Sequence, residues 1–230
     1  MENVFGEYSK FYDSLYRTKD YALEAKYIED IIKKHGIANS QKLIDLGCGT
    51  GSHSIIWAKN GWSVIGVDRS EPMLQIARTK AKEKNLEINF LQGDLSNFII
   101  KEESCYDVAV SMFAVVGYLT ENKSLIHLFT NIEKILKPGG LFIFDCWFGP
   151  SVLSDKPIDK YRLSEENGVR LIRFTHPELH PLKNVIDVNF HVVEIHNGQI
   201  QTEVKEMHPM RFFLLQKLSC FLARLDLTLK

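Results

Sequence analysis

A glycine-rich turn is the clearest chemical feature of the chain. The residues Asp45-Leu46-Gly47-Cys48-Gly49-Thr50-Gly51 place one acid and then three glycines at every second position, where the short apolar segment 42–46 ends. Glycine has no Cβ, so it lets a ligand approach the backbone, and it adopts dihedral angles that other residues avoid. At the carboxyl end of a parallel strand, this turn predicts a ligand-binding crevice.

Two further acids follow the next two apolar segments. Asp68 closes segment 63–67, at about the separation from the glycines that is expected of an acid on ribose hydroxyls. Gly93-Asp94-Leu95 closes segment 88–91 in the same way. Because the carboxyl ends of neighbouring parallel strands meet at one edge of a sheet, these groups should converge. The sequence therefore predicts a nucleoside-binding site.

The elements that must position these groups alternate between strand and helix over residues 21–147. Apolar runs predict five strands, and helical spacing predicts a helix between each pair of them except the third and fourth, with one more before the first. The strands are predicted at 42–46, 63–67, 88–91, 106–111 and 141–144, and the helices end at Gly36, at about 60, at about 85 and at 136. This alternation predicts a Rossmann-like α/β fold, a doubly wound and mostly parallel sheet covered on both faces.

The pattern changes after Trp147, where the segments 171–174, 185–195 and 200–207 read as strands. His196-Asn197-Gly198-Gln199 predicts a type I′ hairpin turn, which would set Ile195 opposite Ile200 and Val193 opposite Thr202. The apolar face switches near Val192, which indicates a β-bulge there. We predict an antiparallel β flap inserted after the fifth strand, followed by one more helix.

The glycine spacing separates this turn from that of nicotinamide dinucleotide-binding proteins, whose third glycine would fall at Ser52. Together with Gly93-Asp94-Leu95 and with Lys137-Pro138-Gly139-Gly140 before the fifth strand, it resembles class I S-adenosylmethionine-dependent methyltransferases. The resemblance covers residues 21–147 well and the remainder loosely. It implies a transferase of the EC 2.1.1 class with S-adenosylmethionine as its cofactor.

The resemblance also implies which residues contact the cofactor. Asp68 would bind the ribose and Asp94 the adenine amino group, while Leu95 and Met73 would sandwich the adenine ring. The other residues implied to bind the cofactor are Tyr21, Asp45, Gly47, Cys48, Gly49, Thr50, Gly51, Arg69, Gly93, Ser111 and Met112.

Two further stretches resemble the small-molecule branch of the family, and in particular N-methyltransferases of nucleotide-linked aminosugars, which also carry a β-rich flap. These are Ser111-Met112-Phe113 with Gly117-Tyr118-Leu119, and the opening aromatic run 11–21. By that resemblance Tyr12 and Tyr21 fold over the cofactor, Tyr118 faces the methyl acceptor, and Tyr12 and Tyr118 are the candidate catalytic residues. The alternative is that the aromatic side chains of the opening run only pack a helix onto the sheet.

Histidines offer two weaker candidates. His53 could reach the methionine end of the cofactor, or it could be an ordinary residue of a first helical turn. An amine acceptor must be neutral to attack, so a base or a water path is required. Tyr118 and His127 are the candidate bases, although His127 falls in a predicted helix where a structural role is the alternative.

Composition restricts the partners. With 28 basic and 29 acidic residues the net charge is −1, which disfavours nucleic acid as a partner. The chain also lacks the Asn/Asp-Pro-Pro-Tyr/Phe and Pro-Cys sequences of DNA methylases. Its four cysteines are far apart and predict neither a metal site nor a disulfide framework. With no leader pattern and no long apolar run, we expect a cytoplasmic protein that binds no membrane and acts on a small molecule.

We predict a single domain with four parts: an N-terminal helical cover (1–40), a cofactor-binding core (41–148), the antiparallel flap (151–210), and a last helix with a partial strand (211–230). The family sheet normally ends in two more strands, so these C-terminal strands look shortened. The flap, or the partner subunit of a homodimer, would then cover the exposed sheet edge. The alternatives are a non-catalytic module that binds S-adenosylmethionine, and a methyltransferase acting on a macromolecule.

Overall fold

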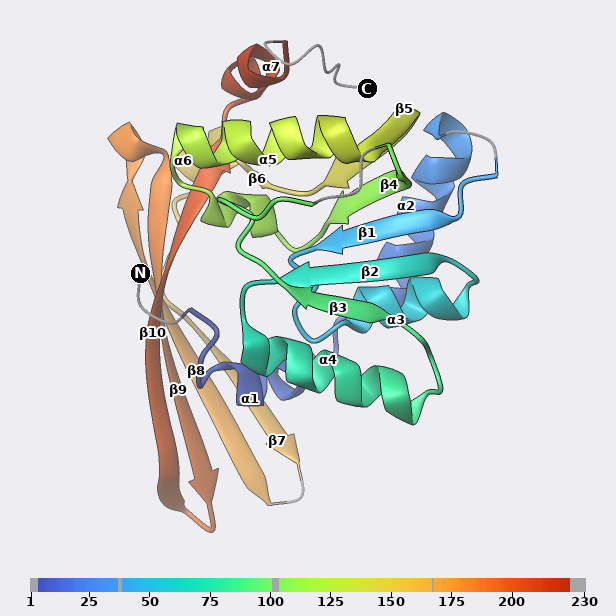
Figure 1. Ribbon diagram of the computed structural model, residues 1–230. Helices are drawn as coiled ribbons and strands as arrows, with labels where there is room; N and C mark the ends of the chain where they lie inside the picture. The colour runs from blue at the N-terminus through green and yellow to red at the C-terminus, as the bar shows by residue number, and fades with distance from the viewer. Residues whose placement is uncertain (1–3, 37–38, 101–103, 167, 224–230) are drawn as a thin grey trace.

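A computed structural model describes residues 4–36, 39–100, 104–166 and 168–223, and it contains two five-stranded sheets (Figure 1). The first sheet is parallel throughout, with the strand order β3-β2-β1-β4-β5. Its strands are β1 (Lys42–Leu46), β2 (Ser63–Asp68), β3 (Asn89–Gln92), β4 (Tyr106–Ser111) and β5 (Leu136–Phe144). The order reverses between β1 and β4, which confirms the predicted doubly wound fold.

Helices cover both faces of this sheet. Strand side chains alternate between the faces, so that Leu43 and Val64 pack against helices α2 (Tyr21–His35) and α3 (Ser52–Lys59). Ile44 and Val67 point the other way and pack against α5 (Asn122–Ile135). Helix α4 (Glu71–Glu83) joins the side of α3.

The helix boundaries follow from local signals in the sequence. Ser70 caps α4, because its side chain accepts a hydrogen bond from the Met73 N–H, and Pro72 lies in the first turn. Helix α2 ends at Gly36 as predicted. The start of β5 was predicted too late: Leu136 already pairs with Tyr106 before the register shifts, so the Pro-Gly-Gly stretch lies inside the strand rather than before it.

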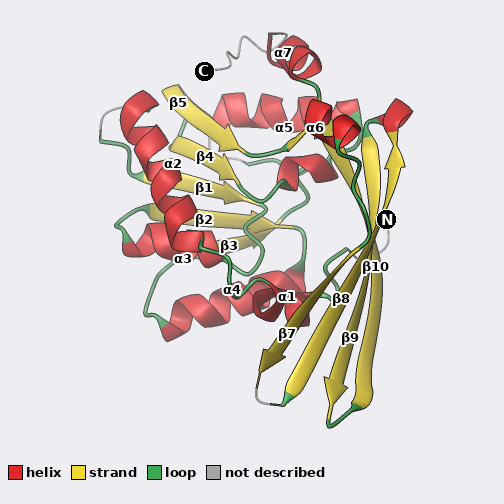
Figure 2. Ribbon diagram, turned by 180° about the vertical axis from the view of Figure 1, so that it is seen from behind, coloured by secondary structure: helices red, strands yellow, loops and turns green. Residues whose placement is uncertain are grey.

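The second sheet is the predicted flap, and it lies across the carboxyl ends of the parallel strands (Figures 1 and 2). It has the order β6-β10-β9-β8-β7 and is antiparallel except for the β6–β10 pair. Its strands are β6 (Trp147–Phe148), β7 (Lys160–Glu166), β8 (Val169–His180), β9 (Val185–His196) and β10 (Gln199–Phe213). The sequence analysis did not predict β7.

The β9–β10 hairpin has the predicted turn, with Asn197 and Gly198 both at positive φ. Ile200 lies opposite Ile195 as expected. The expected pairing of Thr202 with Val193 was wrong, because Thr202 lies opposite Glu194. The ladder is irregular between Ile200 and Thr202, and not near Val192, where we had placed the bulge.

The remaining helices connect the two sheets. Helix α1 (Ser9–Leu15) buries Phe11 and Leu15 against Leu171 and Val192 of the second sheet. Helix α7 (Leu215–Ala223) joins the core around α5, and α6 (Gly149–Ser154) follows β6. Within the described chain β5 remains an edge strand, since β6 pairs with β10 and not with β5. The predicted last strand lies outside the described residues.

Candidate functional site

Two neighbouring cavities lie where the parallel strands end. The first has a volume of about 310 Å³, and the second of about 740 Å³. Their walls share five residues, Phe5, Gly47, Asp68, Val115 and Tyr118. The cavities therefore meet beside the glycine turn, at the switch point of the sheet where ligands of such folds bind.

The three glycines of the turn all have positive φ, but they serve different purposes. A Cβ on Gly47 would lie 2.3 Å from a Val115 methyl carbon, and one on Gly51 would lie 3.0 Å from Ala77 and Phe90. A Cβ on Gly49 would meet nothing within 4 Å, so this glycine faces open space. Gly47 and Gly51 permit close packing, whereas Gly49 leaves room for a ligand.

Asp68 lies at the end of β2 and faces both cavities. Its Oδ2 accepts a hydrogen bond from the Gly49 N–H, and its Oδ1 accepts one from the Ser70 N–H, both at 2.8 Å. Burial raises the pKa of this carboxyl, although the two backbone N–H groups partly offset that effect. A carboxylate offers about four acceptor positions, so acceptor capacity remains for the hydroxyls of a ribose.

Asp94 follows β3 and lines the second cavity together with Arg69, Gly93 and Leu95. Its Oδ1 accepts a hydrogen bond from the Ser96 N–H at 2.9 Å. His127 lies on the wall of this second cavity, where its Nε2 contacts the Asn131 amide and the Phe98 carbonyl. His127 therefore shares a cavity with Tyr118 but not with Tyr12, which lines only the first cavity.

Three predicted cofactor residues line neither cavity. Asp45 is 2% exposed and accepts a hydrogen bond from the Ser54 hydroxyl. Burial, with a smaller contribution from nearby Asp68, raises the pKa of Asp45 to about 7 against the effect of Ser54. Ser111 donates to the Leu46 carbonyl, and Gly51 packs as described above. These residues stabilise the turn on the side away from the cavities, and a direct contact with the cofactor stays a prediction.

Aromatic side chains make up a large part of the wall of the first cavity. They come from both halves of the fold: Tyr8, Tyr12, Tyr16 and Tyr21 from the N-terminal region, Phe113 and Tyr118 from the loop after β4, and Trp147 and Phe190 from the flap. Tyr8, Tyr12 and Tyr16 also pack against the second sheet. A packing role and a role in the site are therefore compatible for these aromatic residues, since one ring can pack against the flap and face the cavity.

The wall of the first cavity beside the glycine turn also includes Cys48, Thr50, His53, Met73 and Met112. The Thr50 hydroxyl donates to Asp13 at 2.7 Å. The His53 Nε2 lies 2.8 Å from a Glu24 oxygen, and burial lowers the pKa of His53 although Glu24 opposes the shift. The Tyr21 hydroxyl is buried, and burial raises its pKa, an effect that its interaction with the neighbouring Tyr12 side chain partly opposes.

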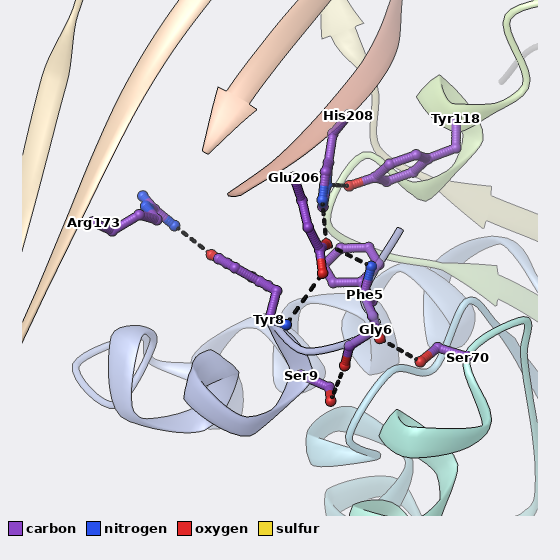
Figure 3. A network of polar contacts seen from close by, with 9 residues as sticks. All are labelled: Phe5, Gly6, Tyr8, Ser9, Ser70, Tyr118, Arg173, Glu206 and His208. Carbon is purple, nitrogen blue, oxygen red and sulfur yellow. Dashed lines mark hydrogen bonds and ion pairs between the residues drawn. The ribbon is translucent and has the colours of Figure 1, made fainter. Parts of the chain in front are cut away.

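A buried polar chain in the flap was missed by the sequence analysis (Figure 3). The Tyr118 hydroxyl lies 2.9 Å from the Nδ1 of His208, whose Nε2 lies 3.0 Å from the Oε2 of Glu206. Glu206 also accepts hydrogen bonds from the backbone N–H groups of Phe5 and Tyr8, at 2.8 and 3.1 Å. The only local signal was the two-residue spacing of an acid and a histidine on one strand.

Asp145 is the second missed residue, and it lies directly after β5. Its Oδ1 accepts a hydrogen bond from the Ala114 N–H at 2.8 Å, and the carboxyl group lines the first cavity. Phe113 and Ala114 both adopt positive φ, so Asp145 stabilises an uncommon turn. Burial raises the pKa of Asp145, and the backbone N–H groups partly offset this.

Two classes of site do not occur within the described ranges. No group of three or more histidine, cysteine, aspartate or glutamate side chains there could hold a metal ion. No helix in the same ranges is long and apolar enough to cross a bilayer.

Comparison with known proteins finds similarity to methyltransferases in both sequence and structure. Residues 43–140 match the family model described as a methyltransferase domain. A Streptomyces venezuelae relative, dTDP-3-amino-3,4,6-trideoxy-alpha-D-glucopyranose N,N-dimethyltransferase, is 32% identical over 65% of this chain. The match spans 61% of that relative, and 57% of a Geobacillus sp. (strain WCH70) protein that is named as a methyltransferase. The chain thus spans less than two thirds of these curated relatives.

Solved structures extend the likeness to nearly the whole chain. Streptomyces venezuelae DesVI has a TM-score of 0.79 and 25% identity, covering 94% of this chain and 87% of its own. An S-adenosylmethionine-dependent methyltransferase of Clostridium acetobutylicum has a TM-score of 0.78 at 21% identity, covering 96% and 87%. The second sheet is therefore part of the shared fold.

Proposed function

We propose that the protein transfers the methyl group of S-adenosylmethionine to an amino group on a small molecule, and the match of residues 43–140 to the family model described as a methyltransferase domain supports this proposal. The observation that carries the proposal is the convergence of Gly49, Asp68 and Asp94 on two cavities that meet, of which the first has aromatic walls. The names of relatives that methylate aminosugars support the acceptor class.

The residues that line the two cavities fit the parts of the cofactor from the adenine to the methionine. Asp68 would hold the ribose with the acceptor positions that Gly49 and Ser70 leave free. Asp94 would accept from the adenine amino group, with Leu95 beside the ring. The methionine part would extend over the glycine turn toward Tyr21, which lines the first cavity.

The cofactor, when bound, supplies an activated methyl group on a positively charged sulfur. The main task of the protein is then to orient the acceptor, and orientation can lower a barrier by about 7–11 kcal/mol. Tyr12 of α1 and Tyr118 of the loop after β4 both line the first cavity, where they would contact the acceptor. Tyr118 lines both cavities, so it lies where donor and acceptor must meet.

The first cavity also suits an amine. Aromatic ring faces attract a cation, and a carboxylate stabilises it further. Asp145 supplies a carboxylate in the aromatic wall, and its raised pKa reflects burial in that wall. An amine would therefore be drawn in as its ammonium form and would need to lose a proton before it attacks the methyl group.

The test is a turnover assay with S-adenosylmethionine and a panel of acceptors. The panel contains dTDP-linked aminosugars, beginning with the sugar named for the Streptomyces venezuelae relative, and the matching 3-hydroxy sugars as oxygen controls. We expect S-adenosylhomocysteine and a methylated product with the amines only. Tight cofactor binding without turnover on any acceptor would instead favour a non-catalytic module, and product formed only on RNA or protein would favour a macromolecular acceptor.

We further propose a cytoplasmic protein that does not bind nucleic acid. The described cysteines Cys48, Cys105 and Cys146 are free thiols, and the overall charge is near zero. The exposed edge of β5 supports a homodimer in which a partner subunit covers that edge. Light scattering of the purified protein measures the mass of the assembly, and a monomeric mass would contradict the dimer.

A further inference from the structure

We propose that the Tyr118–His208–Glu206 chain removes the proton from the acceptor amine, with Tyr118 as the catalytic residue and the other two as positioning residues. The proposal rests on the proposed function, and it gives one of the two candidate bases, Tyr118, a partner that can take up its proton. It is carried by three observations: the hydrogen-bonded order of the three side chains, their burial, and the place of Tyr118 between the two cavities.

The first observation is the direction of the hydrogen bonds. Glu206 accepts from two backbone N–H groups, those of Phe5 and Tyr8, which only an acceptor oxygen can satisfy. Burial raises the pKa of Glu206, but the hydrogen bonds from His208 and the two backbone groups outweigh it and leave the pKa below its usual value. An ionised Glu206 has no proton to donate, so the His208 Nε2 must carry one and donate it to the carboxylate.

The second step follows from that assignment. A neutral His208 with its proton on Nε2 presents a bare Nδ1, which accepts from the Tyr118 hydroxyl at 2.9 Å. The oxygen of Tyr118 is then free to accept a proton from the cavity side. His208 is 0% exposed, so water does not compete for its ring nitrogens.

Two other tyrosines of the first cavity, Tyr8 and Tyr16, differ in this respect. The hydroxyls of Tyr8 and Tyr16 both accept from the guanidinium of Arg173, at 2.9 and 2.7 Å. A guanidinium has donors only, so it cannot take up a proton that either hydroxyl would pass on. Tyr118 has an imidazole as its partner, and an imidazole can accept.

The proton balance is complete within these residues. One proton leaves the ammonium nitrogen of the acceptor for the Tyr118 oxygen, while the Tyr118 hydroxyl proton moves to His208 Nδ1. The nitrogen keeps the electron pair with which it forms its bond to the methyl carbon, and the pair of the broken carbon–sulfur bond stays on sulfur. Tyr118 never becomes a free phenolate, which agrees with its pKa, raised well above the usual value by burial and then by Tyr16 and Tyr8. The imidazolium formed at His208 is stabilised by Glu206 at 3.0 Å.

The first experiment reads the proton positions directly and needs no substrate. The protein is labelled with ¹⁵N-histidine, and the His208 signals are identified by their absence from the spectrum of His208→Asn. Near neutral pH we expect a neutral ring with its proton on Nε2, a changed Nδ1 shift in Tyr118→Phe, and a proton moved to Nδ1 in Glu206→Gln. A ring with a proton on Nδ1, or on both nitrogens, in the unsubstituted protein would overturn the proposal.

The second experiment separates chemistry from binding. General acid–base catalysis contributes about 10²–10⁴-fold to rates, so Tyr118→Phe should lower kcat by about a hundredfold or more and change KM for the aminosugar by less than about threefold. The matched control is His196→Asn, because His196 pairs with Glu194 at the same two-residue spacing and the same 3.0 Å, on β9. Its kcat should match that of the unsubstituted protein.

The outcomes distinguish the two levels of the proposal. Unchanged kcat in Tyr118→Phe would overturn the relay and leave the methyltransferase function intact. Absence of turnover in the unsubstituted protein with every amine would instead refute the proposed function, while the histidine spectrum would still report where the His208 proton lies. Should His208→Asn fail to fold, Tyr118→Phe and Glu206→Gln identify the same signals by their shifts.

Discussion

Replacing Asp45 with asparagine tests whether the acid behind the glycine turn opposes folding. Asp45 is 2% exposed, and burial raises its pKa from 3.8 to about 7. A shift of about three pKa units corresponds to ~4 kcal/mol between the two protonation states. Because the folded state holds the proton more tightly than the unfolded chain, this stability is fully present below about pH 4 and is lost as the pH rises through about 7.

Asparagine has the same shape as a protonated aspartate and does not titrate. We expect the free energy of unfolding of Asp45→Asn, measured relative to that of the unsubstituted protein, to increase by about 4 kcal/mol between pH 4 and pH 8, so that the variant becomes the relatively more stable protein. Urea unfolding of the apo protein at both pH values measures it, with Glu83→Gln as a control that removes an exposed acid. An equal difference between the two proteins at both pH values would refute the reasoning.

Three other substitutions test the site. Asp68→Ala should weaken cofactor binding by about 1–3 kcal/mol through lost ribose hydrogen bonds, and an unchanged affinity in a calorimetric titration would contradict our placement of the ribose. Gly47→Ala should lower the melting temperature more than Gly49→Ala, because only the Cβ at position 47 would collide with a neighbour. Gly49→Ala should mainly weaken cofactor binding. Equal effects of the two substitutions on melting temperature and on binding would contradict the different purposes of the two glycines. Ser70→Ala removes a helix cap and the 2.8 Å bond to the Phe5 carbonyl, so we expect a loss of about 1 kcal/mol and faster hydrogen exchange at residues 4–8, and unchanged exchange there would argue against this anchor.

The convergence of Asp68 and Asp94 beside the glycine turn could be predicted because its requirements are local. Each of the first three parallel strands ends in its own polar residue, and a helix cap such as Ser70 can be read from a few neighbouring positions. What the sequence could not supply is the partner of each group. Nothing near Gly47 indicates that a Val115 methyl would collide with a Cβ there, since Val115 follows a different strand.

The chain of Tyr118, His208 and Glu206 could not be predicted for the same physical reason. It joins the loop after β4 to β10 of the flap, and Phe5 is separated by 201 residues from the carboxylate that binds its backbone. A one-residue error of register would move every side chain of a strand to the other face. The irregularity at Ile200 and Thr202, which we had placed near Val192, is such a shift.

Residues 4–8 connect the parallel sheet to the flap, and this connection explains how the flap helps to form the walls of both cavities. The backbone of Phe5 donates to Glu206 of the flap and accepts from Ser70 at the start of α4. Its ring lies 4.7 Å from that of His208 and 5.8 Å from that of Tyr118, measured between ring centroids. A shift of the flap relative to the parallel sheet would thus disturb the wall between the cavities and the buried histidine at the same time. Sequence changes in the flap can alter which acceptor fits, but those that displace Glu206 should also impair the proton path, so acceptor choice and base strength are coupled through one side chain.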